Sequence, residues 1–342
     1  VVSIDMISYQ KQLNNSRRPT VCGILKSISR TTGTRLRHGC PKKHSASAAC
    51  TVAMLLDVQV SGRAPDKDTP VLFFFGGFPD DHTCWDALAP RFQETHTLAV
   101  TCWPDYEIKD PSLGGGRLSK WLGYSHDSVL EMLKAAILAT SPSQPVTLVA
   151  HDWGAAAAVW LAAKHPTLIK SLVLLDVGIM TPAKMSIKQV LVVLAYQWWL
   201  TLAFIVSQFL STAIGDVLIG VFPWKLIGPT PYETKLPRRQ REIHSWMCYP
   251  YYHTWSRILV PSGLPAIQFP PKLGIPVLYV FGQKKRIMFH TDDFLRNIES
   301  VRDGSRWRSL ECGHWIQAEQ PDALELEMRA FIKETSSNNM KQ

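Results

Sequence analysis

The sequence predicts an α/β fold in which helices flank a mostly parallel β-sheet. Short apolar runs, typical of buried strands, alternate along the chain with longer segments of helical periodicity. That alternation favours parallel strands joined by helices that cover both faces of the sheet. Because 342 residues can bury a sizeable core, we expect one large domain together with an insertion or a tail.

The predicted elements follow one another in a simple order. A half-buried edge strand is predicted at 52–60, where the apolar run alternates toward its end. Buried strands are predicted at 71–75, 97–101, 146–150, 171–175 and 276–281, with a weaker last strand near 305–310. Helices are predicted at 84–92, 128–140, 155–164, 292–301 and 321–335.

The alternation stops between residues 178 and 275, where the sequence is mainly helical and rich in Trp and Tyr. This insertion divides the predicted α/β core into 51–177 and 276–342. Ligands of open α/β sheets bind at the carboxyl ends of the strands. We therefore interpret 178–275 as a helical cap over that edge of the sheet.

One part of the insertion is unusually apolar. Residues 189–215 include no charged residue, and 190–209 is long enough to span a bilayer. A buried pair of cap helices is the favoured interpretation, because polar side chains interrupt the run and a true span would pull the cap away from the sheet. Peripheral membrane contact through 189–215 is the alternative.

The most informative segment is 148–155, which reads Leu-Val-Ala-His-Asp-Trp-Gly-Ala. A predicted strand ends here and a helix begins, and two small residues, Ala150 and Gly154, lie two positions on either side of Asp152. This pattern is typical of a nucleophile elbow, whose strained turn requires small neighbours. The usual residue at its tip is Ser. An Asp there predicts attack on an electrophilic sp3 carbon and an alkyl–enzyme ester, rather than acyl transfer.

Two further segments offer partners for Asp152. The sequence Phe-Gly-Gly-Phe-Pro-Asp at 75–80 follows a predicted strand, so the backbone N–H of Phe78 can pair with that of Trp153 as an oxyanion hole. The sequence Glu-Cys-Gly-His-Trp at 311–315 follows the last strand. His314 on that loop could activate water to hydrolyse the ester.

A third group, an acid, is needed to orient His314. The turn after the strand at 276–281, where this acid is expected, has Lys285 instead of a carboxylate. Asp176, at the end of the preceding strand, is positioned to reach the same histidine, although an ordinary strand-end or capping role is equally compatible. Weaker candidates are Glu311, Asp292 and Asp293.

Together the motifs GGFP, AHDWGA and CGHW resemble those of the α/β-hydrolase superfamily, in the branch of epoxide hydrolases and haloalkane dehalogenases. The resemblance extends over about 51–333 and implies the α/β-hydrolase fold with an inserted cap and no cofactor or metal. Members of that branch usually have His where Gly76 stands, and Asp where Lys285 stands. The departure at Gly76 affects the support of the loop at 75–80. The departure at Lys285 leaves the identity of the orienting acid open.

Within this branch, an epoxide hydrolase is favoured. Its members pair Phe with the Gly-x-Pro turn, as at Phe78, and use cap tyrosines to protonate the epoxide oxygen. The cap offers Tyr249, Tyr251 and Tyr252, of which Tyr251 and Tyr252 are the favoured donors. The Trp-rich cap predicts a small lipophilic substrate. The alternatives are a haloalkane dehalogenase, with Trp153 helping to bind halide, and a non-catalytic binding protein on the same fold.

The formal charge of +9 is concentrated at the N-terminus. Residues 1–50 hold nine Lys or Arg against one acid, and no basic stripe with interleaved aromatics follows, so we predict no nucleic-acid partner. The composition of 1–50 predicts either a mitochondrial transit peptide or a disordered basic extension. The expected location of the protein is therefore mitochondrial or cytoplasmic. The seven cysteines form no CxxC pair, which predicts neither a zinc site nor a disulfide framework.

Overall fold

The computed structural model describes residues 56–107 (without 65 and 67), 118–178 (without 119), 185–222, 243–259 and 274–339 (without 286 and 302). Residues 53–342 make up one compact unit. The basic segment 1–50 lies outside the described residues, so the transit peptide and the two compartments remain predictions.

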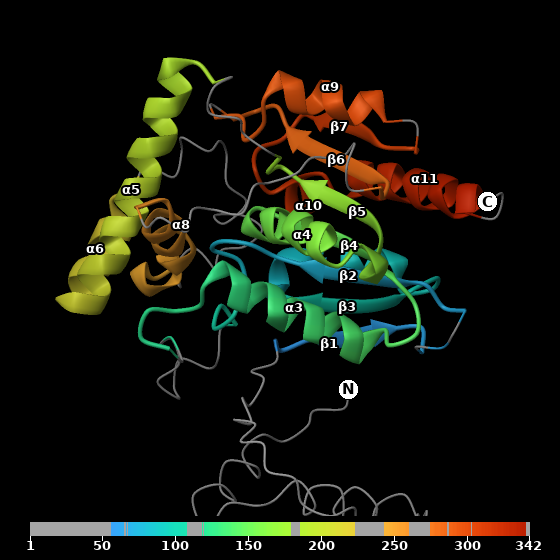
Figure 1. Cartoon of the computed structure of the whole chain (residues 1–342), viewed down its shortest axis with the longest axis horizontal. Coiled ribbons are helices and arrows are strands. Elements are labelled where there is room, and N and C mark those ends of the chain that lie inside the picture. Colours follow the sequence, from blue (N-terminus) through green and yellow to red (C-terminus); the bar gives the residue numbers. More distant parts are fainter. Residues whose placement is uncertain are drawn as a thin grey trace, which may run out of the picture. The chain divides into compact units, whose positions relative to one another are not determined.

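The described residues form a seven-stranded sheet with the order β1-β3-β2-β4-β5-β6-β7 (Figure 1). The strands are β1 Gln59–Gly62, β2 Val71–Phe75, β3 Thr97–Thr101, β4 Val146–His151, β5 Ile169–Leu175, β6 Val277–Gly282 and β7 Arg306–Leu310. β1 pairs antiparallel with β3, and the remaining neighbours pair in parallel. The predicted α/β class and mostly parallel sheet are confirmed.

Helices cover both faces of this sheet, which explains the continuous apolar runs of its strands. In β2, Phe73 and Phe75 pack toward α3 (His126–Thr140), α4 (Trp153–Lys164) and α9 (Asp292–Ser300). Leu72 and Phe74 point the other way, toward α10 (Ile316–Glu319) and α11 (Pro321–Asn339). Because successive side chains enter two different cores, no polar residue alternates with the apolar ones.

Two local predictions are wrong. The helix expected at 84–92 is replaced by two short 3-10 turns, His82–Trp85 and Ala89–Phe92. Pro90 explains the break, because it lacks a backbone N–H and its ring clashes with the preceding turn of an α-helix. The edge strand is Gln59–Gly62, with its four residues exposed rather than half-buried.

The described part of the insertion between β5 and β6 is helical, as predicted. It comprises α5 (Ile187–Phe209), α6 (Thr212–Gly220), the 3-10 turn Ser245–Cys248 and α8 (Tyr249–Leu259). α5 begins with a capping box, in which the side chains of Ser186 and Gln189 each bond the backbone N–H of the other residue. α5 packs against α6 and α8 (Figure 1).

The favoured interpretation of 189–215 as a buried pair of helices is wrong in one respect. The helix pair exists, but only 33% of the most apolar 18-residue window of α5 is buried. Among the described residues, α5 alone is long and apolar enough to cross a membrane. Large apolar side chains on the outside of the pair are exposed, among them Ile187, Leu191, Leu202, Phe209 and Val217.

Candidate active site

Asp152 lies between the end of β4 and the start of α4, as the elbow motif predicts. Its backbone has φ 53° and ψ −124°, a conformation that costs a residue with a side chain about 1–3 kcal/mol. Two glycines leave room for this turn. A Cβ atom on Gly154 would lie 2.4 Å from the carbonyl oxygen of Phe75, and one on Gly77 would lie 2.5 Å from the backbone nitrogen of Trp153.

The two oxygens of the Asp152 carboxylate have different neighbours. Oδ1 accepts a hydrogen bond of 2.9 Å from the backbone N–H of Phe78. Oδ2 lies 3.5 Å from Nε2 of His314. The backbone N–H of Trp153 is at the first position of α4, where no intrahelical acceptor exists. One oxygen is therefore held at the predicted oxyanion hole, while the other faces the histidine.

His314 has its other ring nitrogen bound to Asp176. Nδ1 lies 2.5 Å from Oδ2 of Asp176, a carboxylate with no exposed surface. The backbone N–H of Gly282 donates to Oδ1 of Asp176 at 3.1 Å. Among the candidate acids, the structure thus brings Asp176 to the histidine. Glu311 instead pairs with Lys284, and Asp293 pairs with Arg296.

Lys285, which stands where the family usually has the acid, is the third partner of Asp176. Its side chain is fully buried, and Nζ donates to Oδ1 of Asp176. The ammonium also lies 5.3 Å from the centroid of the Phe289 ring. The position is therefore part of the site, since the lysine compensates the charge of an acid that comes from the neighbouring strand.

This arrangement shifts two pKa values. Burial raises the pKa of Asp176, but Lys285 and His314 outweigh burial and hold that pKa well below its usual range. Burial lowers the pKa of His314, but the negative charges of Asp176 and Asp152 outweigh it and raise the pKa to about 9. The imidazole is therefore cationic at neutral pH while the carboxylate of Asp176 is ionised.

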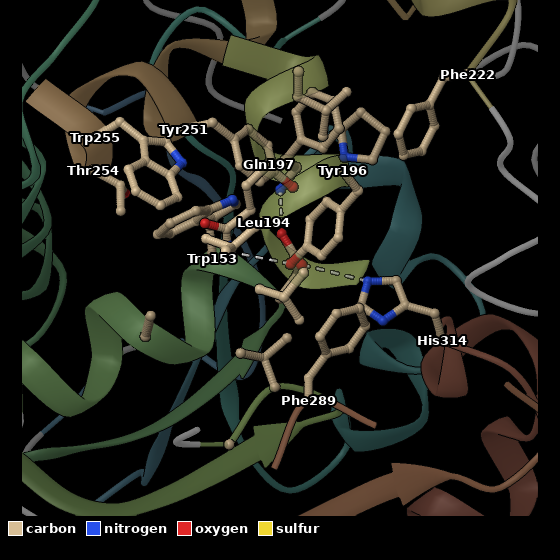
Figure 2. A pocket seen from close by; sticks show the side chains of 18 of the residues that line it. Trp153, Leu194, Tyr196, Gln197, Phe222, Tyr251, Thr254, Trp255, Phe289 and His314 are labelled. Carbon is tan, nitrogen blue, oxygen red and sulfur yellow. Dashed lines mark hydrogen bonds and ion pairs between the residues drawn. The ribbon is translucent and has the colours of Figure 1, made fainter. Parts of the chain in front are cut away.

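A cavity of about 350 Å³ opens above Asp152, between the sheet and the inserted helices. Phe78, Trp153 and His314 line it from the core, and α5 and α8 contribute the rest of an apolar and aromatic wall. Figure 2 shows Tyr196 and Tyr251 extending from these helices toward the side where Trp153 and His314 lie. Such a lining suits a lipophilic molecule.

Of the two predicted proton donors, only Tyr251 lines the cavity. Its ring contacts the rings of Phe78 and Trp153 edge-on, with centroids 5.3 Å and 5.2 Å apart. The prediction for Tyr252 is wrong, because this side chain does not line the cavity and its ring packs on Phe204, with centroids 5.2 Å apart. Tyr249 is also excluded, since its buried hydroxyl donates to the carbonyl of Pro104.

The sequence analysis missed Tyr196, the second tyrosine of the cavity. It lies on α5, 6.3 Å from Tyr251 between ring centroids, and its hydroxyl accepts a hydrogen bond of 3.4 Å from Gln197. A sequence signal for Tyr196 exists within the uncharged segment 189–215. Val193, Tyr196, Gln197 and Leu200 recur at helical spacing and mark one face of α5.

Burial raises the pKa of both cavity tyrosines, and the charge of Asp152 raises them further. Both hydroxyls are therefore protonated at neutral pH. Within the ranges that the structure describes, no cluster of three or more His, Cys, Asp or Glu side chains could hold a metal ion. The expectation that no cofactor is needed remains a prediction.

Comparison with known proteins agrees with this architecture. Residues 70–213 match the sequence model of the alpha/beta hydrolase fold family. The chain therefore has the α/β-hydrolase fold. Its fold superposes on an epoxide hydrolase from Bacillus megaterium with a TM-score of 0.60 and 20% identity, covering 81% of this chain and 96% of the other. A thermophilic esterase from Thermogutta terrifontis matches with a TM-score of 0.58 and 13% identity, covering 82% and 93%.

A curated relative of this α/β-hydrolase-fold protein is the "Probable oxidoreductase EphD" of Mycobacterium tuberculosis, 29% identical over 104 residues. The match covers 30% of this chain and 16% of the relative, so the chain spans about a sixth of the curated protein that it matches. At these identities the solved structures establish the fold alone.

Proposed function

We propose that the protein is a hydrolase that opens epoxides through an alkyl ester on Asp152. The observation that carries this proposal is the meeting of two sets of groups in one apolar cavity. Asp152, His314 and Asp176 form a nucleophile, base and acid series. Tyr196 and Tyr251, both protonated, face the same space and can donate to an oxygen bound there.

In the first step, Oδ2 of Asp152 attacks an epoxide carbon, and the C–O bond of the ring breaks. The backbone N–H of Phe78 keeps Oδ1 in place, which orients the attacking oxygen. A tyrosine hydroxyl gives its proton to the ring oxygen as negative charge develops there. Phe78 and Trp153 support this role, because their rings contact the ring of Tyr251 edge-on and hold it at the cavity.

In the second step, water hydrolyses the ester. Esterification removes the charge of Asp152, one of the two carboxylates that raise the pKa of His314. That pKa therefore falls once the ester forms. Nε2 can then release its proton, through solvent, to the tyrosinate left by the first step, and accept one from water. Water attacks the ester carbonyl, and the oxyanion forms beside the N–H groups of Phe78 and Trp153. The bond between the carboxyl carbon and Oδ2 then breaks, His314 returns its proton to Oδ2, and the diol leaves with Oδ2 and the former epoxide oxygen.

Two alternatives are less well supported. A haloalkane dehalogenase needs side-chain donors for halide, and the side chain of Phe78 offers only an aromatic ring. A non-catalytic binding protein was suggested by the missing acid at Lys285. Asp176 supplies that acid within hydrogen-bonding distance of His314, which removes the reason for this alternative.

A single turnover in water labelled with ¹⁸O tests the proposal. With enzyme in excess over styrene oxide, the label should enter the carboxylate of Asp152, and the first diol should carry unlabelled oxygen from that side chain. Mass spectrometry of the peptide and of the diol gives both readouts. Asp152→Asn should form neither diol nor ester. Label that appears directly in the diol, or halide release from a bromoalkane without epoxide turnover, would contradict the proposal.

A further inference from the structure

The helix α5 has two apolar faces on opposite sides. One face lines the cavity with residues that recur every three or four positions, namely Val190, Val193, Leu194, Tyr196, Gln197 and Leu200. The other face is here called the outer face. It consists of Ile187, Leu191, Trp198, Leu202 and Phe209, which are 43–79% exposed, and the adjacent Trp199 is 38% exposed. A helix at the surface of a soluble protein normally has one apolar stripe and one polar one.

The outer face continues beyond α5. Ile214 and Val217 of α6 are exposed beside it. Trp121, which is 60% exposed, contacts the ring of Phe209 edge-on, with ring centroids 4.9 Å apart. No charged residue occurs from 189 to 215. Contiguous exposed apolar surface of this kind marks an interaction site, and the absence of charge leaves little to specify a protein partner.

The outer face also adjoins the mouth of the cavity. Trp255 and Ile258 of α8 line the cavity, and Ile258 is 46% exposed. The ring of Trp198 on the outer face packs on that of Trp255, with centroids 4.8 Å apart. A rigid partner seated on Trp198 would therefore crowd the entrance. A fluid lipid layer would leave it open to molecules dissolved in that layer.

We propose that the outer face of α5, together with α6 and Trp121, docks on the surface of a lipid bilayer, from which the substrate enters the cavity. The entry of substrate rests on the epoxide-hydrolase proposal, but the docking itself does not. Exposed indoles suit the interface between headgroups and acyl chains. α5 lies in that interface rather than across the bilayer, because its inner face is needed for the cavity wall.

Flotation with phosphatidylcholine vesicles tests the docking with the full chain. A zwitterionic lipid and high salt are chosen so that the basic residues of 1–50 contribute little. The double variant Leu191→Glu/Leu202→Glu should reduce the vesicle-bound fraction about ten-fold or more, because two apolar contacts with the bilayer are replaced by charges. Leu326→Glu, on α11 and 71% exposed, is the matched control and should bind like the wild type.

Turnover separates docking from chemistry. The double variant should hydrolyse a water-soluble epoxide at the wild-type rate but should lose activity on a long-chain epoxide dissolved in the vesicles. Vesicle binding without any epoxide turnover would leave the docking intact and overturn the proposed function. Wild-type protein that stays in the soluble fraction would overturn the docking, as would a dimer in sedimentation that becomes monomeric in the double variant.

Discussion

The ends of β4 and β5 offer two aspartates in nearly the same local setting. Asp152 and Asp176 each follow a buried strand, each has a positive φ, 53° and 66°, and each approaches one ring nitrogen of His314. Their surroundings differ. The Asp152 side chain is 13% exposed toward the cavity, whereas Asp176 is fully buried against Lys285. In the proposed mechanism, the role of each carboxylate is therefore set by its access to the cavity and by its counter-charge, not by residue type or backbone position.

The strongest test of this comparison separates the two half-reactions. Replacing Asp176 should leave the attack by Asp152 possible but should impair ester hydrolysis, because His314 loses the group that orients it. Loss of such an orienting acid costs about 10⁴-fold in rate. The double variant Asp176→Asn/Lys285→Met should therefore accumulate an ester whose mass exceeds that of the protein by one epoxide.

The double variant is preferred to Asp176→Asn alone, since the single change would leave the Lys285 ammonium buried without its partner. Asp152→Asn is the matched control and should form no adduct. Absence of adduct in the Asp176 variant, with substrate still bound, would mean that the two aspartates do not divide the reaction in this way.

Replacing either cavity tyrosine should slow only the first step of the proposed reaction, the formation of the ester on Asp152. Tyr251→Phe and Tyr196→Phe should each slow ester formation by about 10²-fold, since each removes a general acid, while the hydrolysis rate of a preformed ester should hardly change. Tyr252→Phe is the control and should stay near the wild-type rate, because its ring packs outside the cavity. Rapid-quench kinetics measure the two steps separately.

Removing the positive charge of Lys285 should lower the free energy of unfolding. Lys285→Met leaves the Oδ1 of Asp176 without its ammonium partner in a buried site, which costs about 3–5 kcal/mol of unfolding free energy. The matched substitution Lys284→Met removes an exposed pair with Glu311, and should lower the free energy of unfolding by less than about 1 kcal/mol. Urea unfolding of the two variants provides the comparison, and equal losses would argue against a buried pair.

The smallest effect concerns pH. The pKa of His314 is raised in the folded protein, from 6.5 to about 9. Its contribution to stability is therefore complete below about pH 6.5 and is lost as pH rises toward 9. His314→Gln should flatten this part of the stability curve relative to the wild type. Unchanged curvature in the variant would mean that the imidazole is not cationic in the folded protein.

Local motifs and non-local contacts differ in how far the sequence revealed them. Asp152 and His314 were predictable, because the small residues and turns that support them are adjacent in the chain. The partnership of Asp176 was not decided, since a strand-end aspartate looks the same whether it caps a helix or binds a histidine 138 residues away. Lys285 was noticed only as a departure, because its contact with Asp176 spans 109 residues.

Two other differences have local causes. Tyr196 was missed because the surrounding apolar residues of α5 suggested packing or membrane contact rather than a polar group facing the cavity. The exposed face of α5 agreed with the alternative interpretation and not with the favoured one, because an uncharged helix is equally compatible with burial and with an apolar partner. Pro90, by contrast, was visible in the sequence and should have excluded a continuous helix at 84–92.

The close contact between the turns that contain Gly77 and Gly154 determines which positions of this protein tolerate substitution. A methyl group on Gly77 or Gly154 would lie within 2.6 Å of backbone atoms of the opposite turn, so neither position can vary unless both loops move. The wall above them consists of separate side chains on α5 and α8, each replaceable without disturbing its neighbours' backbone. Laboratory evolution toward new substrates should therefore succeed in the inserted helices and fail at the floor. In the proposed mechanism, the residues that carry out the reaction are fixed together, whereas the residues that select the substrate can change one at a time.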